Sequence, residues 1–276
     1  MKILVTGASG MIGSYLIKAL LDARYEVVGI DRKEGKDERE KIIVADLGDA
    51  DVLKKIVEEN KVDRVIHLAA LAHIAGETDL SWKRYYHVNV ECSKNVFEAA
   101  GDRPVLLIST VDVYGFVKGM VNGETELKPV TVYGKSKAMA EKECKKLKNY
   151  TIFRFSPVYT LDNKRDIQMR YYLQYPDWAY IIGKGSEYEV LSVEKAVQAM
   201  VDWVNTDPDG RVRVIKDERR LEMAAVIESE KIAGRAKYVL HFPLWIVACG
   251  YCVARITGKN KYTYLLHKAI HPLRSE

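Results

Sequence analysis

Residues 2–13 read Lys-Ile-Leu-Val-Thr-Gly-Ala-Ser-Gly-Met-Ile-Gly, with glycines at positions 7, 10 and 13. The apolar start of this stretch predicts a strand over Ile3–Thr6, and the amphipathic run Met11–Leu21 predicts a helix. Glycines between them permit a tight turn and close approach of the backbone to a ligand. The free N–H groups and positive dipole end of a helix N-terminus bind phosphate. The stretch therefore predicts a pyrophosphate site for a dinucleotide, formed by Gly7, Gly10, Met11, Ile12 and Gly13.

An acidic residue lies where it could contact the adenosine ribose of a dinucleotide bound to this loop. Asp31 ends a second strand-like run, Glu26–Ile30, about 20 residues after the glycines. A carboxylate there can accept hydrogen bonds from the adenosine ribose and would repel a 2′-phosphate, so it favours NAD over NADP. Arg32 beside it could accommodate a phosphate, which keeps NADP open as the second choice. The alternative is that Asp31 has a purely structural role and caps a turn without binding a ligand.

The first part of the chain alternates short apolar runs with longer amphipathic ones. The strand-like runs are Ile3–Thr6, Glu26–Ile30, Lys41–Val44, Arg64–His67, Val105–Ile108 and Thr151–Phe155. The helix-like runs are Met11–Leu21, Ala50–Glu59, Trp82–Ala100 and Tyr133–Leu147. Such alternation predicts βαβ units with right-handed crossovers. The expected fold class is α/β, with a Rossmann-type doubly wound parallel sheet and a smaller C-terminal substrate lobe.

The alternation of strand-like and helix-like runs ends after residue 160, where glycine, proline and aromatic residues are frequent. A helix-like run, Val193–Val204, and a strand-like run, Val212–Ile215, come later. We expect a smaller lobe over the carboxyl edge of the sheet, where ligands bind in such folds. The expected division is 1–160 for the NAD-binding Rossmann domain, with 188–205 packing back onto it, and 161–187 together with 206–276 for the substrate-binding lobe.

A hydroxyl, a phenol and an ammonium group are the candidates for catalysis. Thr110 ends the fifth strand-like run, and Tyr133 and Lys137 lie four residues apart at the start of a helix-like run. Side chains four apart share a helix face, so Lys137 could stabilise the phenolate form of Tyr133. Thr110 could hydrogen-bond the substrate oxygen whose proton moves. The same spacing recurs at Tyr114/Lys118, Tyr180/Lys184 and Tyr264/Lys268, and the position directly after the strand with Thr110 selects Tyr133/Lys137.

Taken in order, these motifs resemble the extended short-chain dehydrogenases/reductases of the NAD-dependent epimerase/dehydratase type. The resemblance covers the chain up to Tyr159. It rests on Gly7/Gly10/Gly13, Asp31, Asp46-Leu47, His67-Leu68-Ala69-Ala70, Asn89, Ser109-Thr110-Val111-Asp112-Val113-Tyr114-Gly115, Tyr133/Lys137 and Arg154-Phe155-Ser156-Pro157-Val158-Tyr159.

The resemblance implies a Rossmann domain that binds NAD, a small-molecule substrate and a homodimer. It makes Thr110, Tyr133 and Lys137 catalytic, with Tyr133 as acid/base and Lys137 also on the nicotinamide ribose. Further cofactor contacts are expected from Arg32, Asp46, Leu47, Leu68, Ala69, Ala70, Asn89, Ser109, Pro157 and Val158.

Two departures from the family pattern bear on the reaction. Dehydratases of this group carry Ser-Thr-Asp-Glu-Val-Tyr-Gly, whereas this chain has Val111 and Asp112 at the two acidic positions. Val111 cannot protonate a leaving hydroxyl, and Asp112 is either catalytic or a structural hydrogen-bonding group. Many nucleotide-sugar enzymes carry an asparagine where this chain has Pro157.

Three functions follow from these observations. The first is an epimerase-type enzyme that acts on a sugar or nucleotide sugar by hydride transfer at a hydroxyl/ketone carbon. The second is an NAD(P)-dependent dehydrogenase or reductase of a non-nucleotide carbonyl or hydroxyl substrate. The third is a non-catalytic, nucleotide-sensing relative, against which the intact Thr110, Tyr133 and Lys137 argue.

Charge and composition limit the partners and the location. The 276 residues carry a net charge of +5, and the stretch from Lys231 to Glu276 holds eight Lys/Arg against one Asp/Glu. This basic stretch could face phosphates, an anionic membrane or simply solvent. No nucleic-acid-binding motif accompanies it. The N-terminus lacks a signal-peptide pattern, so the expected location is the cytoplasm.

The C-terminal apolar run is the remaining feature. Leu240–Ala254 is interrupted by His241 and Pro243 and is shorter than a transmembrane helix, so no span is expected. It is interpreted as a core or dimer-interface helix, with membrane-surface contact as the alternative. Cys249 and Cys252 within it are expected to be buried helix thiols, and no metal site is expected.

Overall fold

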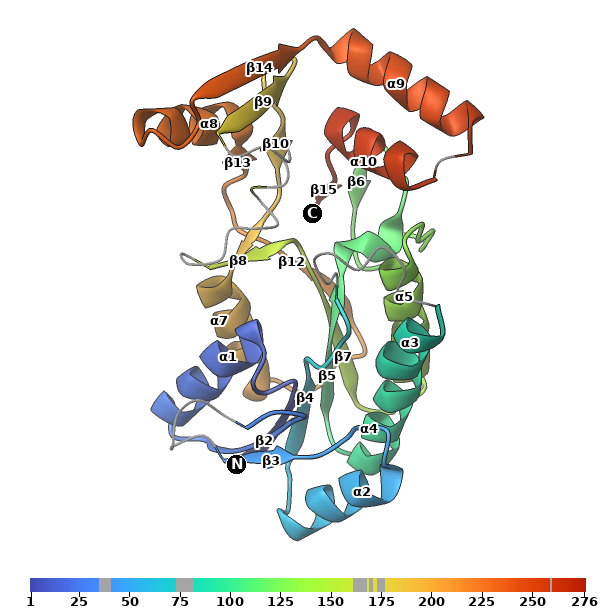
Figure 1. Ribbon diagram of the computed structural model, residues 1–276. Helices are drawn as coiled ribbons and strands as arrows, with labels where there is room; N and C mark the ends of the chain where they lie inside the picture. The colour runs from blue at the N-terminus through green and yellow to red at the C-terminus, as the bar shows by residue number, and fades with distance from the viewer. Residues whose placement is uncertain (35–40, 73–81, 161–167, 169–170, 173–176, 259) are drawn as a thin grey trace.

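The computed structural model of the chain (Figure 1) consists of a central sheet with helices on both faces and a smaller group of elements at its carboxyl edge. The residues that the structure describes are 1–34, 41–72, 82–160, 168, 171–172, 177–258 and 260–276.

Seven parallel strands form the central sheet, in the order β12-β7-β5-β4-β1-β2-β3. Their bounds are Lys2–Thr6 (β1), Glu26–Asp31 (β2), Ile42–Val44 (β3), Arg64–His67 (β4), Val105–Thr110 (β5), Tyr150–Phe155 (β7) and Val212–Ile215 (β12). The chain reverses its direction of travel across the sheet between β1 and β4, where Thr6 is in register with His67. Ligands bind at such a point, outside the carboxyl ends of the strands. The predicted fold class is confirmed.

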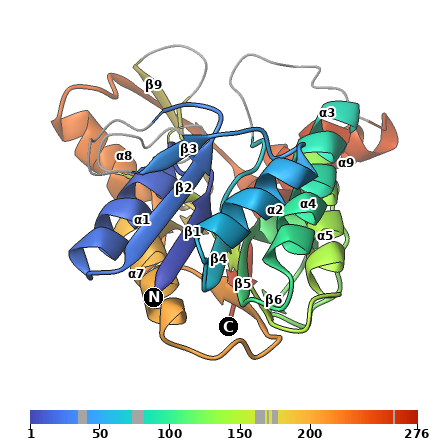
Figure 2. The ribbon, with the colours of Figure 1, turned by 90° about the horizontal axis from the view of Figure 1, so that it is seen from below.

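Each strand sends alternate side chains to opposite faces of the sheet, and both faces are covered (Figure 2). On one face, Ile3 and Val5 pack with helices α1 (Met11–Asp22) and α7 (Val193–Val204). On the other, Leu4 packs with three helices, namely α2 (Ala50–Glu59), α4 (Cys92–Ala100) and α5 (Val132–Cys144). Near-continuous apolar strands are therefore required here, as the sequence has them.

The predicted helix over Trp82–Ala100 is interrupted. It consists of α3 (Trp82–Tyr86), a π-helical turn (His87–Glu91) and α4. A π-helical turn widens a helix by one residue and changes where the following side chains point. This turn carries Asn89, one of the predicted cofactor contacts.

The elements beyond the sheet are short. They are β6 (Met120–Val121), β8 (Val158–Tyr159), β9 (Trp178–Ile182), β10 (Glu187–Tyr188), β11 (Leu191–Ser192), β13 (Leu221–Glu222), α8 (Met223–Ile232), β14 (Tyr238–Phe242), α9 (Leu244–Ile256), α10 (Asn260–Ile270) and β15 (Arg274–Ser275). Strand β14 pairs with β9, and β15 pairs with β6, so the end of the chain returns to the loops above the sheet. The predicted lobe range 206–276 includes Val212–Ile215, yet this run is the edge strand β12, paired with β7. Otherwise the division into domains stays a prediction.

The C-terminal apolar run differs from its prediction. It splits into β14 and α9 at Pro243, because proline cannot donate a backbone hydrogen bond within a helix. Most of α9 is exposed, so the expectation of a core helix is wrong. Cys249 and Cys252 are exposed rather than buried, which corrects the second expectation for this run. Among the described residues, no helix has the length and apolar content that crossing a membrane requires.

Candidate active site

The glycine loop lies at the carboxyl end of β1, directly beside the end of β4. Gly7 has a φ of +73°, which favours glycine, and a Cβ on it would lie 2.8 Å from the Ala69 nitrogen. A Cβ on Gly13 would lie 2.2 Å from the Gly7 carbonyl oxygen. The loop therefore folds tightly against itself and against Ala69, and leads into α1 at Met11. This is the cradle that the approach of a pyrophosphate requires.

Asp31 lies at the end of β2, next to that loop. Its carboxylate accepts hydrogen bonds from the backbone nitrogens of Ser9 (3.0 Å) and Arg32 (2.7 Å). These bonds fix the carboxylate at the rim of the cradle. Because Asp31 is only partly buried and Arg32 is exposed, both side chains can meet a ribose at this edge.

A buried hydrogen-bonded chain that the sequence did not indicate supports the β1–β4 junction. His67 Nδ1 lies 2.6 Å from Thr6 Oγ1, and His67 Nε2 lies 2.8 Å from Ser93 Oγ. The Ala69 nitrogen also donates to Thr6 Oγ1 (3.3 Å). Complete burial, and secondarily the charge of Lys137, lower the pKa of His67 to about 3, so its imidazole is neutral. In the sequence, His67 stands at the end of a predicted strand and within the His67-Leu68-Ala69-Ala70 motif of the family resemblance, but neither indicates its hydroxyl partners.

Asn89 joins the two sides of the cleft. Its Oδ1 accepts from the Leu71 nitrogen (2.7 Å), while its Nδ2 donates to the Leu71 oxygen (3.0 Å) and to Ser136 Oγ (2.8 Å). Asn89 is predicted as a cofactor contact. It is fully buried, and its side-chain amide forms hydrogen bonds with the 68–71 segment and with α5. It positions both of these elements.

The N-terminus of α5 brings Tyr133 and Lys137 next to the loop after Thr110. Thr131 caps the helix by accepting from the Gly134 nitrogen (2.9 Å). A Cβ on Gly134 would lie 2.7 Å from the Asp112 oxygen, so the helix starts in close contact with this loop. Thr110 in turn accepts from the Asp112 nitrogen (3.2 Å). The three predicted catalytic residues thus come from adjoining segments at the carboxyl edge of the sheet.

Lys137 lies in a dry environment. Only 1% of its surface is exposed, and this burial lowers the pKa of its ammonium group to about 8, against the opposing effect of the Glu141 carboxylate one turn further along α5. An ammonium group in such surroundings exerts its charge with little screening by water.

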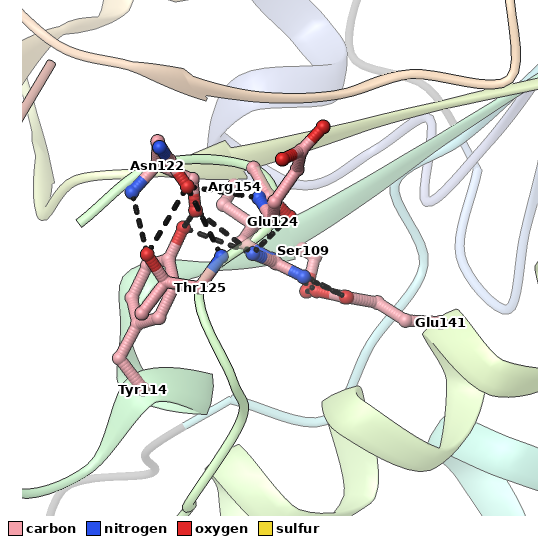
Figure 3. Close-up of polar contacts among 8 residues, drawn as sticks. Ser109, Tyr114, Asn122, Glu124, Thr125, Glu141 and Arg154 are labelled. Carbon is pink, nitrogen blue, oxygen red and sulfur yellow. Dashed lines mark hydrogen bonds and ion pairs between the residues drawn. The ribbon is translucent and has the colours of Figure 1, made fainter.

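A buried ion pair anchors α5 to the sheet (Figure 3). Arg154 on β7 pairs with Glu141 at 2.7 Å, and both side chains are 1% exposed. Ser109, a predicted cofactor contact, donates to Glu141 (2.6 Å), and Arg154 also donates to the Tyr114 hydroxyl (2.9 Å). Ser109 therefore has a structural partner on α5. The network fixes the helix register that carries Lys137.

The C-terminal helix α10 also reaches the site. Lys268 pairs with Asp112 at 2.5 Å, and the Tyr264 hydroxyl lies 3.2 Å from the same carboxylate oxygen. The Tyr264/Lys268 pair has the same spacing but does not follow the strand with Thr110, so the sequence favours Tyr133/Lys137 over it. The tertiary structure brings both residues to the loop, where they line a hollow with Val111, Asp112, Ser156 and Pro157.

The remaining predicted cofactor residues lie around this cleft. Asp46 accepts from the Gly48 nitrogen (2.8 Å), and the Leu47 oxygen accepts from the Asn95 amide (3.0 Å). Leu68 and Ala69 follow β4 beside the glycine loop, and Ala70 comes next. Val158 lies in β8, while Pro157 faces the hollow.

The model of the family described as NAD dependent epimerase/dehydratase matches residues 3–173. A UDP-arabinose 4-epimerase of Arabidopsis thaliana is 33% identical over 156 residues, which is 50% of this chain and 37% of that protein. A UDP-glucose epimerase of Bacillus subtilis, described as uncharacterized, is 33% identical over 187 residues, 58% of this chain and 57% of its own length. The chain thus spans less than two thirds of these curated relatives.

A solved structure shows the same fold over a longer range. The UDP-glucuronic acid 4-epimerase of Bacillus cereus, in complex with UDP-glucuronic acid and NAD, is 25% identical, with a TM-score of 0.71. The likeness covers 88% of this chain and 86% of that one. Since the family model covers more than half of its 276 residues, the chain belongs to the NAD dependent epimerase/dehydratase family.

Proposed function

We propose that the chain is an NAD-dependent epimerase that acts on a nucleotide sugar by hydride transfer at a hydroxyl/ketone carbon. The observation that carries this proposal is the juxtaposition of Tyr133 and buried Lys137 with the Thr110 loop, at the sheet edge that bears the glycine cradle. The relatives named above, which are epimerases of UDP-sugars, support the substrate class.

The chain offers a consistent set of contacts for NAD. The glycine loop would hold the pyrophosphate, Asp31 the adenosine ribose and Lys137 the nicotinamide ribose. When bound, NAD would supply the nicotinamide ring, which can accept a hydride from the substrate and return it.

The acid/base part of the reaction belongs to three side chains. Tyr133 would take the proton from the substrate hydroxyl, Thr110 would hydrogen-bond the same oxygen, and the ammonium group of Lys137 would stabilise the phenolate. After the substrate turns its other face to the cofactor, Tyr133 would return the proton. Water has little access to Lys137, which strengthens its effect on a neighbouring negative charge.

The loop after Thr110 favours an epimerase over a dehydratase. Loss of water requires an acid for the leaving hydroxyl and a base for the carbon acid. Val111 can serve as neither, and Asp112 is bound by Lys268 and Tyr264. A dehydrogenase or reductase of a non-nucleotide substrate is the second candidate, because Pro157, which cannot offer an amide to a sugar, faces the hollow beside Asp112.

The cellular location and the oligomeric state of the protein are two further points. We propose that the protein works in the cytoplasm, because all four cysteines are free, as in proteins of reducing compartments. We also propose a homodimer, on the family resemblance, which sedimentation analysis would test directly.

The deciding experiment identifies the dinucleotide and follows its redox state. Denaturation of the purified protein should release NAD(H), detected by mass spectrometry. UDP-sugars should then be interconverted without net NADH formation, and Tyr133→Phe should lower kcat by at least about 10²-fold. Net production of NADH would favour the dehydrogenase instead. Failure to bind any dinucleotide would rule out both the epimerase and the dehydrogenase.

A further inference from the structure

Helix α9 presents an apolar face to the outside of the molecule. Trp245, Cys249, Cys252, Val253 and Ile256 follow one another at helical spacing and form one side of the helix, here termed the α9 stripe. Trp245 is 67% exposed, Val253 60% and Ile256 85%, and both cysteines are exposed. Contiguous apolar exposure of this kind marks an interaction surface.

The opposite side of α9 already has its packing partner. Val247 and Ala254 are buried, Tyr251 lies against the ring of His267 (5.9 Å between centroids), and Gly250 faces Leu266 of α10. Figure 1 shows α9 at the outer end of the molecule, with α10 between it and the loops above the sheet. The stripe therefore points away from the folded core.

The sequence segment that carries the stripe contains basic residues and no acidic ones. Between Tyr238 and Tyr262 the sequence holds Arg255, Lys259 and Lys261 and no Asp or Glu. Arg255 is exposed in the last turn of α9, next to Ile256. An apolar helix face beside basic side chains is the composition of helices that lie in the interface of anionic membranes.

Aromatic side chains extend the same end of the molecule. Trp178 is 38% exposed and Tyr238 55% exposed, and their rings lie 5.0 Å apart at the start of β9 and β14. In Figure 1, α8, β14 and α9 follow one another along this end. Trp and Tyr prefer the headgroup level of a bilayer, where one end of the ring system is apolar and the other hydrated.

We propose that the α9 stripe docks on an anionic membrane surface, with the helix lying in the interface. The 13 residues of α9 span about 20 Å, which is too short to cross the hydrocarbon core of about 30 Å. A second copy of the chain fits the stripe less well. A two-fold interface would bring Arg255 of one copy to the same interface as Arg255 of the other, with no acidic residue from this stretch to compensate.

Flotation of the full chain with lipid vesicles tests the proposal. Vesicles of about three parts phosphatidylcholine to one part phosphatidylglycerol should carry the protein at low salt, while pure phosphatidylcholine vesicles should carry much less. About 0.5 M salt should release most of the bound protein. Arg255→Gln should weaken the partition about fivefold.

Paired variants separate docking from folding and from self-association. Trp245→Gln/Ile256→Gln should abolish flotation, whereas Trp82→Gln/Val44→Gln, which removes two exposed apolar side chains elsewhere, should float like the parent chain. Circular dichroism would verify that both variants are folded. Absence of flotation by the parent at low salt would overturn the proposal, as would a stripe variant that floats normally. A stripe variant that changes only the sedimentation coefficient would assign the stripe to a second copy.

Discussion

At the residue scale, burial decides what the cleft side chains can do. Lys137 and His67 are both removed from water at the carboxyl edge of the sheet, yet one carries its charge at neutral pH and the other is neutral. Burial lowers both pKa values, and the groups differ mainly because the ammonium group starts from 10.5 and the imidazole from 6.5, with a smaller contribution from their neighbours. Lys137 has the Glu141 carboxylate nearby, whereas His67 is flanked by two hydroxyl groups and feels the charge of Lys137.

The charge of Lys137 should set the alkaline pH limit of activity. Because the pKa of Lys137 is about 8, its charge, and with it the stabilised phenolate of Tyr133, is lost as pH rises through 8. We expect kcat/KM to fall roughly tenfold per pH unit above this value. In Lys137→Arg the charge persists, so the fall should disappear even if the maximal rate is lower. The matched control Lys135→Met, at an exposed position on α5, should keep the parent profile; a profile unchanged by Lys137→Arg would contradict the assignment.

The second residue-scale prediction concerns acid stability. His67 has a pKa of about 3 in the folded chain and about 6.5 when unfolded. The unfolded state therefore binds the extra proton between these values, and the free energy of unfolding should fall by up to about 1.4 kcal/mol per pH unit as pH drops below 6.5. Urea denaturation of His67→Gln should show a weaker pH dependence in this window, although its stability is lower throughout. His241→Gln, at an exposed site, is the control, and equal slopes for all three proteins would refute the prediction.

At the scale of elements, contacts between segments far apart in the chain complete the site. The ion pair of Glu141 and Arg154 joins α5 to β7, and Lys268 joins α10 to the loop after β5. A buried pair costs much desolvation energy, so its contribution is more to a fixed register than to net stability. Periodicity revealed these elements as separate helices and strands, but it carries no information on which side chains meet.

The element-scale prediction tests the link between α10 and the active-site loop. Lys268→Met leaves the Asp112 carboxylate without its cation, so the loop should lose its position and kcat/KM should fall by about tenfold. Because the Lys268 and Asp112 side chains are only 28% and 13% exposed, loss of the pair should also lower the free energy of unfolding, by about 1–3 kcal/mol.

A double-mutant cycle makes this test specific. Asp112→Asn should cost little once Lys268→Met is present, since the interaction is already lost. The exposed Lys118, which belongs to another Tyr-x-x-x-Lys pair, provides the control Lys118→Met with normal kinetics. Strictly additive losses in the Asp112/Lys268 cycle would show that the two residues act independently.

At the scale of the whole molecule, the proposed cofactor cleft lies at the ends of β1, β2 and β4, so a bound dinucleotide should stabilise the entire fold. We expect NAD at about 100 times its Kd to add about 2.7 kcal/mol to the free energy of unfolding. At the same concentration, NADP should add less, because the Asp31 carboxylate would repel its 2′-phosphate and raise the Kd. Thermal unfolding with each dinucleotide measures this, and Asp31→Ser should narrow the gap. Equal stabilisation of the parent chain by both would remove Asp31 as the determinant.

The sheet was predictable because its evidence is local. Most strands of the Rossmann half are marked by an apolar run that a helix-like run of period 3.6 follows. Arg64–His67 and Ala50–Glu59 have the predicted bounds. The parallel, doubly wound order then follows from the handedness of the crossovers. The same reasoning found the glycine loop and Asp31, whose chemistry depends on neighbours close in sequence.

The fold class, the family and the predicted positions of Gly7, Asp31, Tyr133 and Lys137 could be derived from the sequence, because period, spacing and strand ends are properties of short segments. The tertiary structure alone decided that Lys268 pairs with Asp112, that His67 is a buried neutral support, and that α9 lies exposed. These facts depend on contacts across as many as 156 residues of chain. An apolar run shows how much surface favours burial, but only the packed molecule shows which runs its core has room to bury.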